Sequence, residues 1–166
     1  DTLFSVCEDA RTLSGESCHQ LHLDVSEAVT LMGEAKELRS AFSNLIFNAV
    51  RYTPAGGDIF VKWFEENGQK ILSVRDTGVG IEAKHIPRLT ERFYRVDKSR
   101  SRDEGGTGLG LAIVKHVMIR HQGCLLITSE INQGSDFRCC FSSMQGTCSS
   151  NRSRRICYIR YYSNQF

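Results

Sequence analysis

An apolar helical segment that carries two asparagines limits the folds open to this chain most strongly. The helical pattern runs from Leu38 to Tyr52, and the Pro-Ala-Gly-Gly sequence after it predicts the end of the helix. Asn44 and Asn48 are four residues apart, so they share one face. Because apolar side chains surround them, we expect both carboxamides to be buried, where an unpaired polar group costs about 1–3 kcal/mol. They therefore need partners, either the protein's own backbone or a ligand.

The chain has the length and composition of one globular domain. Of its 166 residues, 40% are hydrophobic and 24% are charged, which is enough to bury a core. No apolar run approaches the roughly 20 residues of a membrane span, and no secretory signal is readable. The missing initiator Met indicates a piece of a longer protein. Seven cysteines without a CxxC pair argue against a zinc site and favour reduced thiols in a cytoplasmic setting.

Positive charge is concentrated at the C-terminal end of the chain. The net charge is +2, but residues 143–166 contain four arginines and no acid, which leaves residues 1–142 at −2. The body of the chain is therefore not expected to bind nucleic acid. Residues 143–166 show neither strand alternation nor a helical period, and we expect a basic, poorly ordered tail outside the core.

Hydrophobic periodicity predicts further helices and strands along the chain. Helices are expected at 1–14, 38–52, 83–88 and 109–121, with Ser26 as a candidate cap of another segment. Strands are expected at 21–25, 58–66 and 70–78, followed by a closing hairpin over 124–141. Asn67-Gly68 is the strongest short-range hairpin signal. The predicted fold class is α+β, a two-layer α/β sandwich with a mixed sheet covered by helices on one face.

A polar stripe continues along the long helix from the asparagine pair. Asn44, Asn48, Arg51 and Tyr52 follow one another at i, i+4, i+7 and i+8. Amide oxygens suit Mg²⁺, an arginine can pair with phosphate, and a tyrosine can stack on a base. On these residues alone, a helix whose polar groups are satisfied inside the core remains the alternative.

The segment Asp76-Thr77-Gly78-Val79-Gly80-Ile81 follows a predicted strand. Asp76 alternates in phase with Leu72 and Val74, so its carboxylate is expected on the buried side, where it must be hydrogen-bonded. The amino group of adenine would be a suitable donor. Gly78 and Gly80 would let the backbone approach a ligand closely. Taken alone, the segment is equally compatible with a simple turn.

A third motif, Gly105-Gly106-Thr107-Gly108-Leu109-Gly110-Leu111, opens the last predicted helix. Glycines at a helix N-terminus leave N–H groups bare beside the positive end of the helix dipole, which suits an anion. The motif does not sit in a strand–loop–helix unit with a later acid, so a dinucleotide-binding fold is disfavoured. No GK[ST] follows, which excludes a Walker loop.

In this order, the three motifs resemble the N, G1 and G2 boxes of the ATP-binding domain of sensor histidine kinases, the GHKL or Bergerat fold. Residues 91–97, ERFYRVD, look like the F box of that family. The resemblance covers about residues 20–141 and is greatest to kinases of phosphate-starvation signalling. It implies a helical lead-in from an upstream dimerisation region over 1–19, the ATP-binding domain over 20–142, and an atypical tail over 143–166. The apolar-Pro step that usually follows the closing hairpin is missing, which puts the edge of the last strand in doubt.

The resemblance also implies a set of site residues. Asn48 would ligate Mg²⁺, and the catalytic residues would be Asn44 and Arg51. Tyr52 would lie against adenine, Asp76 would accept from its amino group, and Arg95 would reach toward phosphate. The implied nucleotide-binding set is Asn44, Asn48, Arg51, Tyr52, Asp76, Gly78, Gly80, Ile81, Arg95, Gly106, Thr107, Gly108, Leu109 and Gly110. Residues 97–107 would form a mobile lid with the cations Lys98, Arg100 and Arg102.

The residue at position 44 separates two branches of the family. Gyrase-type and chaperone-type ATPases resemble this fold but carry a glutamate there that activates water, whereas an amide cannot act as a general base. Asn44 therefore implies transfer of the γ-phosphate from ATP to a histidine on a separate dimerisation domain. Alternatives are an ATPase or protein-serine kinase of the same fold, or a nucleotide-binding module without turnover.

The phosphoacceptor histidine of the family is not found in this chain. None of the five histidines has the expected sequence context, and all are interpreted as structural or surface residues: His19, His22, His85, His116 and His121. The implied partners are the dimerisation domain of the same kinase and a response regulator. The full-length protein is expected to be a membrane-anchored homodimer that places this domain in the cytoplasm.

Overall fold

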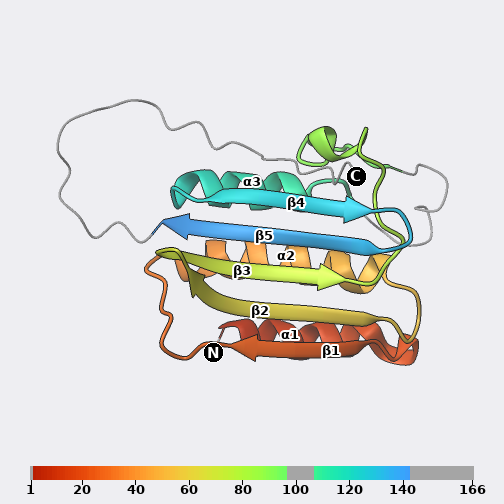
Figure 1. Cartoon of the computed structure of the whole chain (residues 1–166), viewed down its shortest axis with the longest axis horizontal. Coiled ribbons are helices and arrows are strands. Elements are labelled where there is room, and N and C mark those ends of the chain that lie inside the picture. The colour runs from red at the N-terminus through yellow and green to blue at the C-terminus, as the bar shows by residue number, and fades with distance from the viewer. Residues whose placement is uncertain (1, 97–106, 143–166) are drawn as a thin grey trace.

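The computed structural model describes residues 2–96 and 107–142, which form a five-stranded sheet with helices on one face (Figure 1). In chain order the elements are α1 (Thr2–Ser14), the 3₁₀ turn η1 (Gly15–Ser17), β1 (Gln20–Val25), α2 (Ala35–Tyr52), β2 (Asp58–Glu66), β3 (Gln69–Asp76), the 3₁₀ turn η2 (Ile86–Arg88), α3 (Gly110–Arg120), β4 (Cys124–Glu130) and β5 (Gly134–Ser142). This confirms the predicted α+β sandwich.

The sheet is mixed and has the strand order β1-β2-β3-β5-β4. β1 runs parallel to β2, and every other neighbouring pair is antiparallel. The hairpin between β2 and β3 turns at Asn67 and Gly68, which have φ values of 51° and 71°. Positive φ at both central residues is what a two-residue hairpin turn of type I′ requires, so the predicted hairpin is confirmed. β5 lies between β3 and β4, so the closing strand is an inner strand of the sheet rather than an edge.

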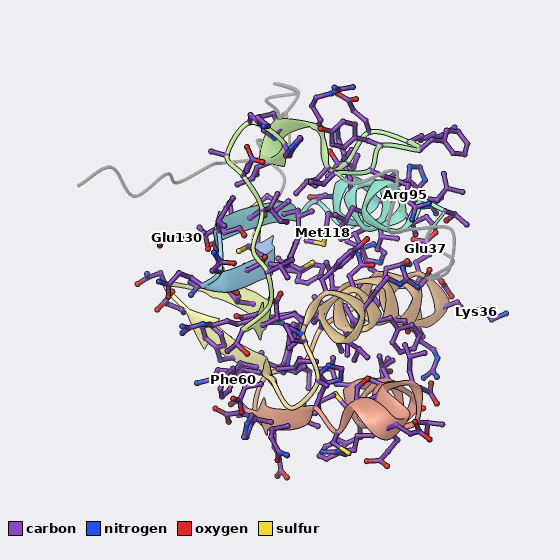
Figure 2. The ribbon with its side chains drawn as sticks, turned by 90° about the vertical axis from the view of Figure 1, so that its right-hand side faces the viewer. Lys36, Glu37, Phe60, Arg95, Met118 and Glu130 are labelled. Carbon is purple, nitrogen blue, oxygen red and sulfur yellow. The ribbon has the colours of Figure 1, made fainter. Side chains whose placement is uncertain are left out.

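The core lies between the sheet and three helices, with α2 in the middle. Leu45 and Ile46 of α2 are almost completely buried, and α2 packs against both α1 and α3. α1 contributes Leu3, Val6, Cys7 and Ala10 to the same core. Figure 2 shows the three helices stacked along one side of the sheet, with Met118 between α3 and the strands and Phe60 on the opposite, helix-free side. The helix at the start of the chain is therefore packed into the core.

No disulfide joins cysteines within the described ranges. Cys7 and Cys139 have no exposed surface. Burial raises the pKa of the Cys7 thiol to about 11, because the thiolate would lose its hydration. In the part of the chain that the structure describes, no helix is both long enough and apolar enough to cross a membrane.

Several element boundaries differ from the sequence-based predictions. α2 begins at Ala35, three residues early, because the Glu34 carboxylate accepts a hydrogen bond from the Glu37 amide and caps the helix. Ser26 caps no helix; its amide instead donates to the Trp63 carbonyl at the end of the β1–β2 pairing. The predicted strand 70–78 ends at Asp76, and the predicted helix over 83–88 is only the 3₁₀ turn η2.

Gly33→Ala is expected to destabilise the fold by about 1–3 kcal/mol. A Cβ at Gly33 would lie 2.8 Å from His121 Cδ2 and 2.8 Å from Leu38 Cδ1. The neighbouring Glu34 amide donates to His121 Nε2 at 3.2 Å, so this segment cannot move away without losing that bond. Urea unfolding would measure the loss. Met32→Ala is the control: Met32 is 88% exposed, and a change within about 0.5 kcal/mol is expected. Equal effects of the two substitutions would contradict the prediction.

Candidate functional site

A cavity of about 770 Å³ opens beside the C-terminal ends of α2 and β3. Its walls come from α2, the loop after β3, the start of α3 and β5, so segments far apart in the sequence meet there. Nine of the predicted nucleotide-binding residues line it: Asn48, Arg51, Tyr52, Asp76, Gly80, Ile81, Arg95, Gly108 and Gly110. This volume is typical of a small-molecule site.

The remaining predicted site residues lie elsewhere. Asn44, Gly78, Thr107 and Leu109 do not line the cavity, although each is close in sequence to a residue that does. Gly106 and the lid cations Lys98, Arg100 and Arg102 lie outside the described residues. The structure therefore brings together the central part of the predicted set.

Asp76, the last residue of β3, is the buried acid of the cavity. It is 4% exposed, as predicted from its phase in the strand. Its Oδ1 accepts hydrogen bonds from the amides of Gly78 at 2.8 Å and Ser135 at 3.2 Å. Burial raises the pKa of Asp76 above its ordinary value; the two amides oppose that rise, and the charge of Asp136 adds to it. Among the described residues, these bonds involve Oδ1 alone, so Oδ2 is left for a donor in the cavity.

The glycines after Asp76 fit against the protein's own backbone. A Cβ at Gly78 would lie 2.4 Å from the Tyr52 carbonyl oxygen, and one at Gly80 would lie 1.9 Å from the Glu130 carbonyl oxygen. Gly80 also has a φ of +69°. The loop is held by hydrogen bonds from the Val79 amide to the Tyr52 carbonyl at 3.3 Å and from the Ile81 amide to Ser129 Oγ at 2.8 Å. The glycines therefore seat the loop between α2 and the β4–β5 turn.

The asparagine pair is less buried than the sequence predicted. Asn44 and Asn48 are only half-buried, because the cavity and the start of α3 lie beside this face of α2. Asn44 Nδ2 donates to the Ser40 carbonyl at 2.8 Å, which satisfies the amide within its own helix. Its Oδ1 faces the start of α3, where a Cβ at Gly110 would lie 2.6 Å away. Asn48 lines the cavity itself.

The F-box segment forms the outer wall of the cavity with Tyr94 and Arg95. The hydroxyl of Tyr94 is 2.6 Å from His85 Nδ1, and the Arg88 guanidinium lies 4.3 Å from the centre of the Tyr94 ring. The Phe93 amide donates to the Gly108 carbonyl at 2.9 Å, and a Cβ at Gly108 would lie 2.9 Å from Phe93 Cα. The F box and the glycine motif before α3 are therefore in direct contact.

Among the cavity residues that were not predicted from the sequence, three come from a segment that precedes all of the motifs. Leu13, Ser17 and His19 come from the end of α1 and the connection to β1, and they line the same cavity as Tyr52 and Asp76. Packing of α1 against α2 and pairing of β1 with β2 bring this segment to the site. No local motif marks it, since the Thr53 carbonyl that accepts from His19 is 34 residues away in sequence.

The oxygen donors of the cavity meet part of what Mg²⁺ requires. Within residues 2–96 and 107–142, no group of three or more His, Cys, Asp or Glu residues could hold a metal ion. The cavity does offer the neutral amide of Asn48, and Mg²⁺ commonly takes one or two protein oxygens while phosphates and waters complete its shell. The residues therefore fit a metal that arrives with a polyphosphate.

Comparison with known proteins identifies the family. The family model described as "Histidine kinase-, DNA gyrase B-, and HSP90-like ATPase" matches residues 33–145. The phosphate regulon sensor protein PhoR of Pseudomonas aeruginosa is 55% identical over 143 residues, which cover 86% of this chain and 32% of that protein. PhoR of Haemophilus influenzae is 46% identical over 120 residues, covering 72% of this chain and 28% of that protein. The chain thus spans about a third of the length of these relatives.

Solved structures agree with the sequence comparison. The mycobacterial sensor histidine kinase MprB has a TM-score of 0.75 and 26% identity, with 84% of this chain and 92% of that chain covered. Full-length ShkA, solved in complex with AMPPNP, has a TM-score of 0.72 and 27% identity, with 84% of this chain and 29% of that chain covered. The chain belongs to the histidine kinase-, DNA gyrase B- and HSP90-like ATPase family, as an ATP-binding domain of the kind found in sensor histidine kinases.

Proposed function

We propose that this domain binds Mg-ATP and is the catalytic domain of a two-component sensor histidine kinase, which passes the γ-phosphate to a histidine on a separate dimerisation domain. The observation that carries ATP binding is the buried carboxylate of Asp76 on the cavity wall. Its Oδ1 accepts from the amides of Gly78 and Ser135, so Oδ2 is the acceptor for the adenine amino group. Tyr52 and Ile81 line the same cavity and would contact the base.

The phosphates would extend from the base toward Asn48 and the start of α3. Asn48, Arg51 and Arg95 line the cavity together with Gly108 and Gly110. The bare amides at the N-terminus of α3 favour an anion, and the two guanidinium groups would neutralise further phosphate charge. Asn48 would supply an oxygen to Mg²⁺, and the metal, when bound with ATP, neutralises charge on the phosphates during transfer.

Asn44 supports transfer to a protein acceptor over hydrolysis. Its carboxamide cannot remove a proton from water, and its Nδ2 is already bonded to the Ser40 carbonyl. Asn44 Oδ1 faces the start of α3, where it would help to hold the metal and phosphates, and Arg51 follows about two turns later on the same helix. The 55% identity to a phosphate regulon sensor supports a role in phosphate-starvation signalling through a response regulator. The whole protein would then be a membrane-anchored homodimer with this domain in the cytoplasm.

The decisive experiment mixes this chain with γ-labelled ATP, Mg²⁺ and a separately prepared dimerisation hairpin that carries the phosphoacceptor histidine. Acid-labile label on the hairpin is the expected result, and a hairpin with His→Gln at the acceptor position is the control. Release of free phosphate without transfer would instead indicate an ATPase, while acid-stable label would indicate a serine kinase. Nucleotide binding without label transfer and without release of free phosphate would indicate a binding module.

Asn48→Ala is expected to weaken Mg-ATP binding about 10- to 100-fold, because the metal–triphosphate complex loses one charge-assisted contact. The same titration in EDTA removes the metal. Under these conditions the ATP affinities of the variant and the wild type should lie within about twofold of each other. Gln69→Ala, which changes an exposed amide on β3, should bind like the wild type in both conditions. An equal loss with and without Mg²⁺ would contradict the assignment of Asn48 to the metal.

A further inference from the structure

The connection between α1 and β1 closes one end of the cavity. His19 and Ser17 line it next to Tyr52, Thr53 and Pro54 at the C-terminal end of α2. This connection precedes the matched family region, which begins at residue 33. It is therefore a part of the pocket that the three sequence motifs do not describe.

Both ring nitrogens of His19 are used by the protein. Nε2 lies 2.8 Å from the Thr53 carbonyl oxygen, and since a carbonyl can only accept, Nε2 carries the proton and donates. Nδ1 lies 2.8 Å from Ser14 Oγ, and this hydroxyl also accepts from the His19 amide at 3.1 Å. In the neutral ring the proton is on Nε2, so Nδ1 accepts and the hydroxyl donates to it. The ring is held in one tautomer and one orientation, half-buried against the end of α2.

Two consecutive carbonyls at the end of α2 accept hydrogen bonds from segments that line the pocket, and one of these bonds comes from His19. Thr53 is the C-cap residue of α2, and its backbone leaves the helix in an extended conformation. Its carbonyl accepts from His19, while the preceding carbonyl, of Tyr52, accepts from the Val79 amide in the loop after Asp76. The two peptide units that follow Tyr52 are thus held separately: the loop after Asp76 holds Tyr52–Thr53, and His19 holds Thr53–Pro54. Tyr52 itself is 50% exposed.

Loss of the His19 bond would leave the rest of this junction in place. The Gly56 amide still donates to the Ser17 carbonyl at 2.8 Å, and the Gln20 amide to the Gly57 carbonyl at 2.9 Å. Thr53 Oγ1 also still donates to the Ala49 carbonyl at 2.7 Å. The consequence of losing the ring should therefore be confined to the position of the Thr53–Pro54 peptide, which follows Tyr52 on the cavity wall.

We propose that His19 is a positioning residue for adenine-nucleotide binding: by holding the Thr53 carbonyl, it fixes the Thr53–Pro54 peptide, which lines the base end of the pocket directly after Tyr52. This inference rests on the function proposed above. With this role, the α1–β1 connection is part of the nucleotide site. It affects binding of the nucleoside and not of the phosphates.

The test compares three variants of this chain by calorimetric titration with ATP, adenosine and inorganic tripolyphosphate. His19→Leu is expected to lower the affinities for ATP and for adenosine by the same factor, about five- to tenfold. The stoichiometry of binding and the affinity for tripolyphosphate should be unchanged. His19→Gln can place an N–H near Nε2 and should bind within about twofold of the wild type. The control is His22→Leu on β1, the strand that follows His19; the His22 ring bonds to Asp58 and stacks on Phe60 away from the cavity.

Each outcome has a definite meaning. A purely structural role for His19 would lower the stoichiometry of binding but leave the dissociation constants unchanged, and that result would overturn the proposal. A His19→Gln variant as weak as His19→Leu, or an equal loss for tripolyphosphate, would also overturn it. If the wild-type chain binds no adenine nucleotide, the proposed function itself fails; if it binds and His19→Leu binds equally well, only the role of His19 fails.

Discussion

Asp76→Asn should lower the affinity for ATP on the order of 100-fold while leaving the unliganded domain more stable at neutral pH. A carboxamide keeps one oxygen for the amides of Gly78 and Ser135. It turns an N–H₂ group toward the cavity, however, where it would meet the adenine amino group with no acceptor between them. Loss of a charge-assisted hydrogen bond together with the clash of two donors accounts for the expected magnitude. Isothermal titration with ATP would measure it.

The stability effect follows from the raised pKa of Asp76. A raised pKa means that the folded state holds the proton more tightly than the unfolded chain does. The stabilisation is therefore present below the unfolded pKa, which is about 3.9, and is lost as the pH rises through the folded value. The carboxamide of the Asp76→Asn variant cannot ionise, so the variant should gain free energy of unfolding relative to the wild type between about pH 4 and pH 8. Urea unfolding at both pH values would measure this gain.

A matched substitution separates this effect from a general loss of charge. Asp24→Asn removes an exposed carboxylate on β1 that lies 3.9 Å from Lys62, outside the cavity. This variant should bind ATP like the wild type and show no comparable gain in stability at the higher pH. As a further readout, Asp76→Asn should lose less affinity for inosine triphosphate than for ATP, because a 6-oxo group accepts from the new amide. Unchanged ATP affinity in Asp76→Asn would contradict its assignment as the adenine acceptor.

Gly80→Ala is expected to cost about 2–4 kcal/mol of folding free energy, the largest stability loss among these substitutions. Two causes combine at this position. The φ of +69° lies in the left-handed region, which is unfavourable for a residue with a Cβ, and the added carbon would lie 1.9 Å from the Glu130 carbonyl oxygen. The β4–β5 turn cannot yield easily, because the Asn132 amide donates to the Val79 carbonyl at 2.9 Å. Urea unfolding monitored by circular dichroism would measure the loss.

Gly56→Ala isolates the backbone cause from the steric one. Gly56 has a φ of +75°, close to that of Gly80, but nothing lies within 4 Å of the position of its Cβ. We expect it to cost only about 1–2 kcal/mol. The difference between the two variants is then the cost of moving the G1 loop away from the β4–β5 turn. If both alanines destabilise the domain equally, the close approach at Gly80 contributes nothing.

Local patterns were sufficient for most of the fold because each depends on near neighbours in sequence. Alternating apolar residues predicted β2 and β3, and Asn67-Gly68 predicted the turn between them, because both of its residues tolerate positive φ. The phase of β3 was enough to place Asp76 on the buried side. Boundaries were less accurate where a side-chain cap decides them, as at Glu34.

Burial of the asparagine pair could not be predicted correctly from the helix alone. Helical spacing shows which residues share a face, but it does not show what covers that face. Here the neighbouring surface is a cavity and the start of α3, so Asn44 and Asn48 are only half-buried and the amide of Asn48 remains available to a ligand. The same limit applies to Gly78 and Gly80, whose closest neighbours are carbonyls from α2 and the β4–β5 turn.

By itself, the sequence determined the α+β class, the order of most elements and the buried acid at the end of β3, since these follow from periodicity and turn chemistry over a few residues. Only the tertiary structure decided which groups surround the pocket. Packing of α1 on α2 brings His19 to the carbonyl of Thr53, and close approach of the β4–β5 turn fixes the loop at Gly80. Contacts between distant segments depend on how whole faces pack, and no local pattern carries that information.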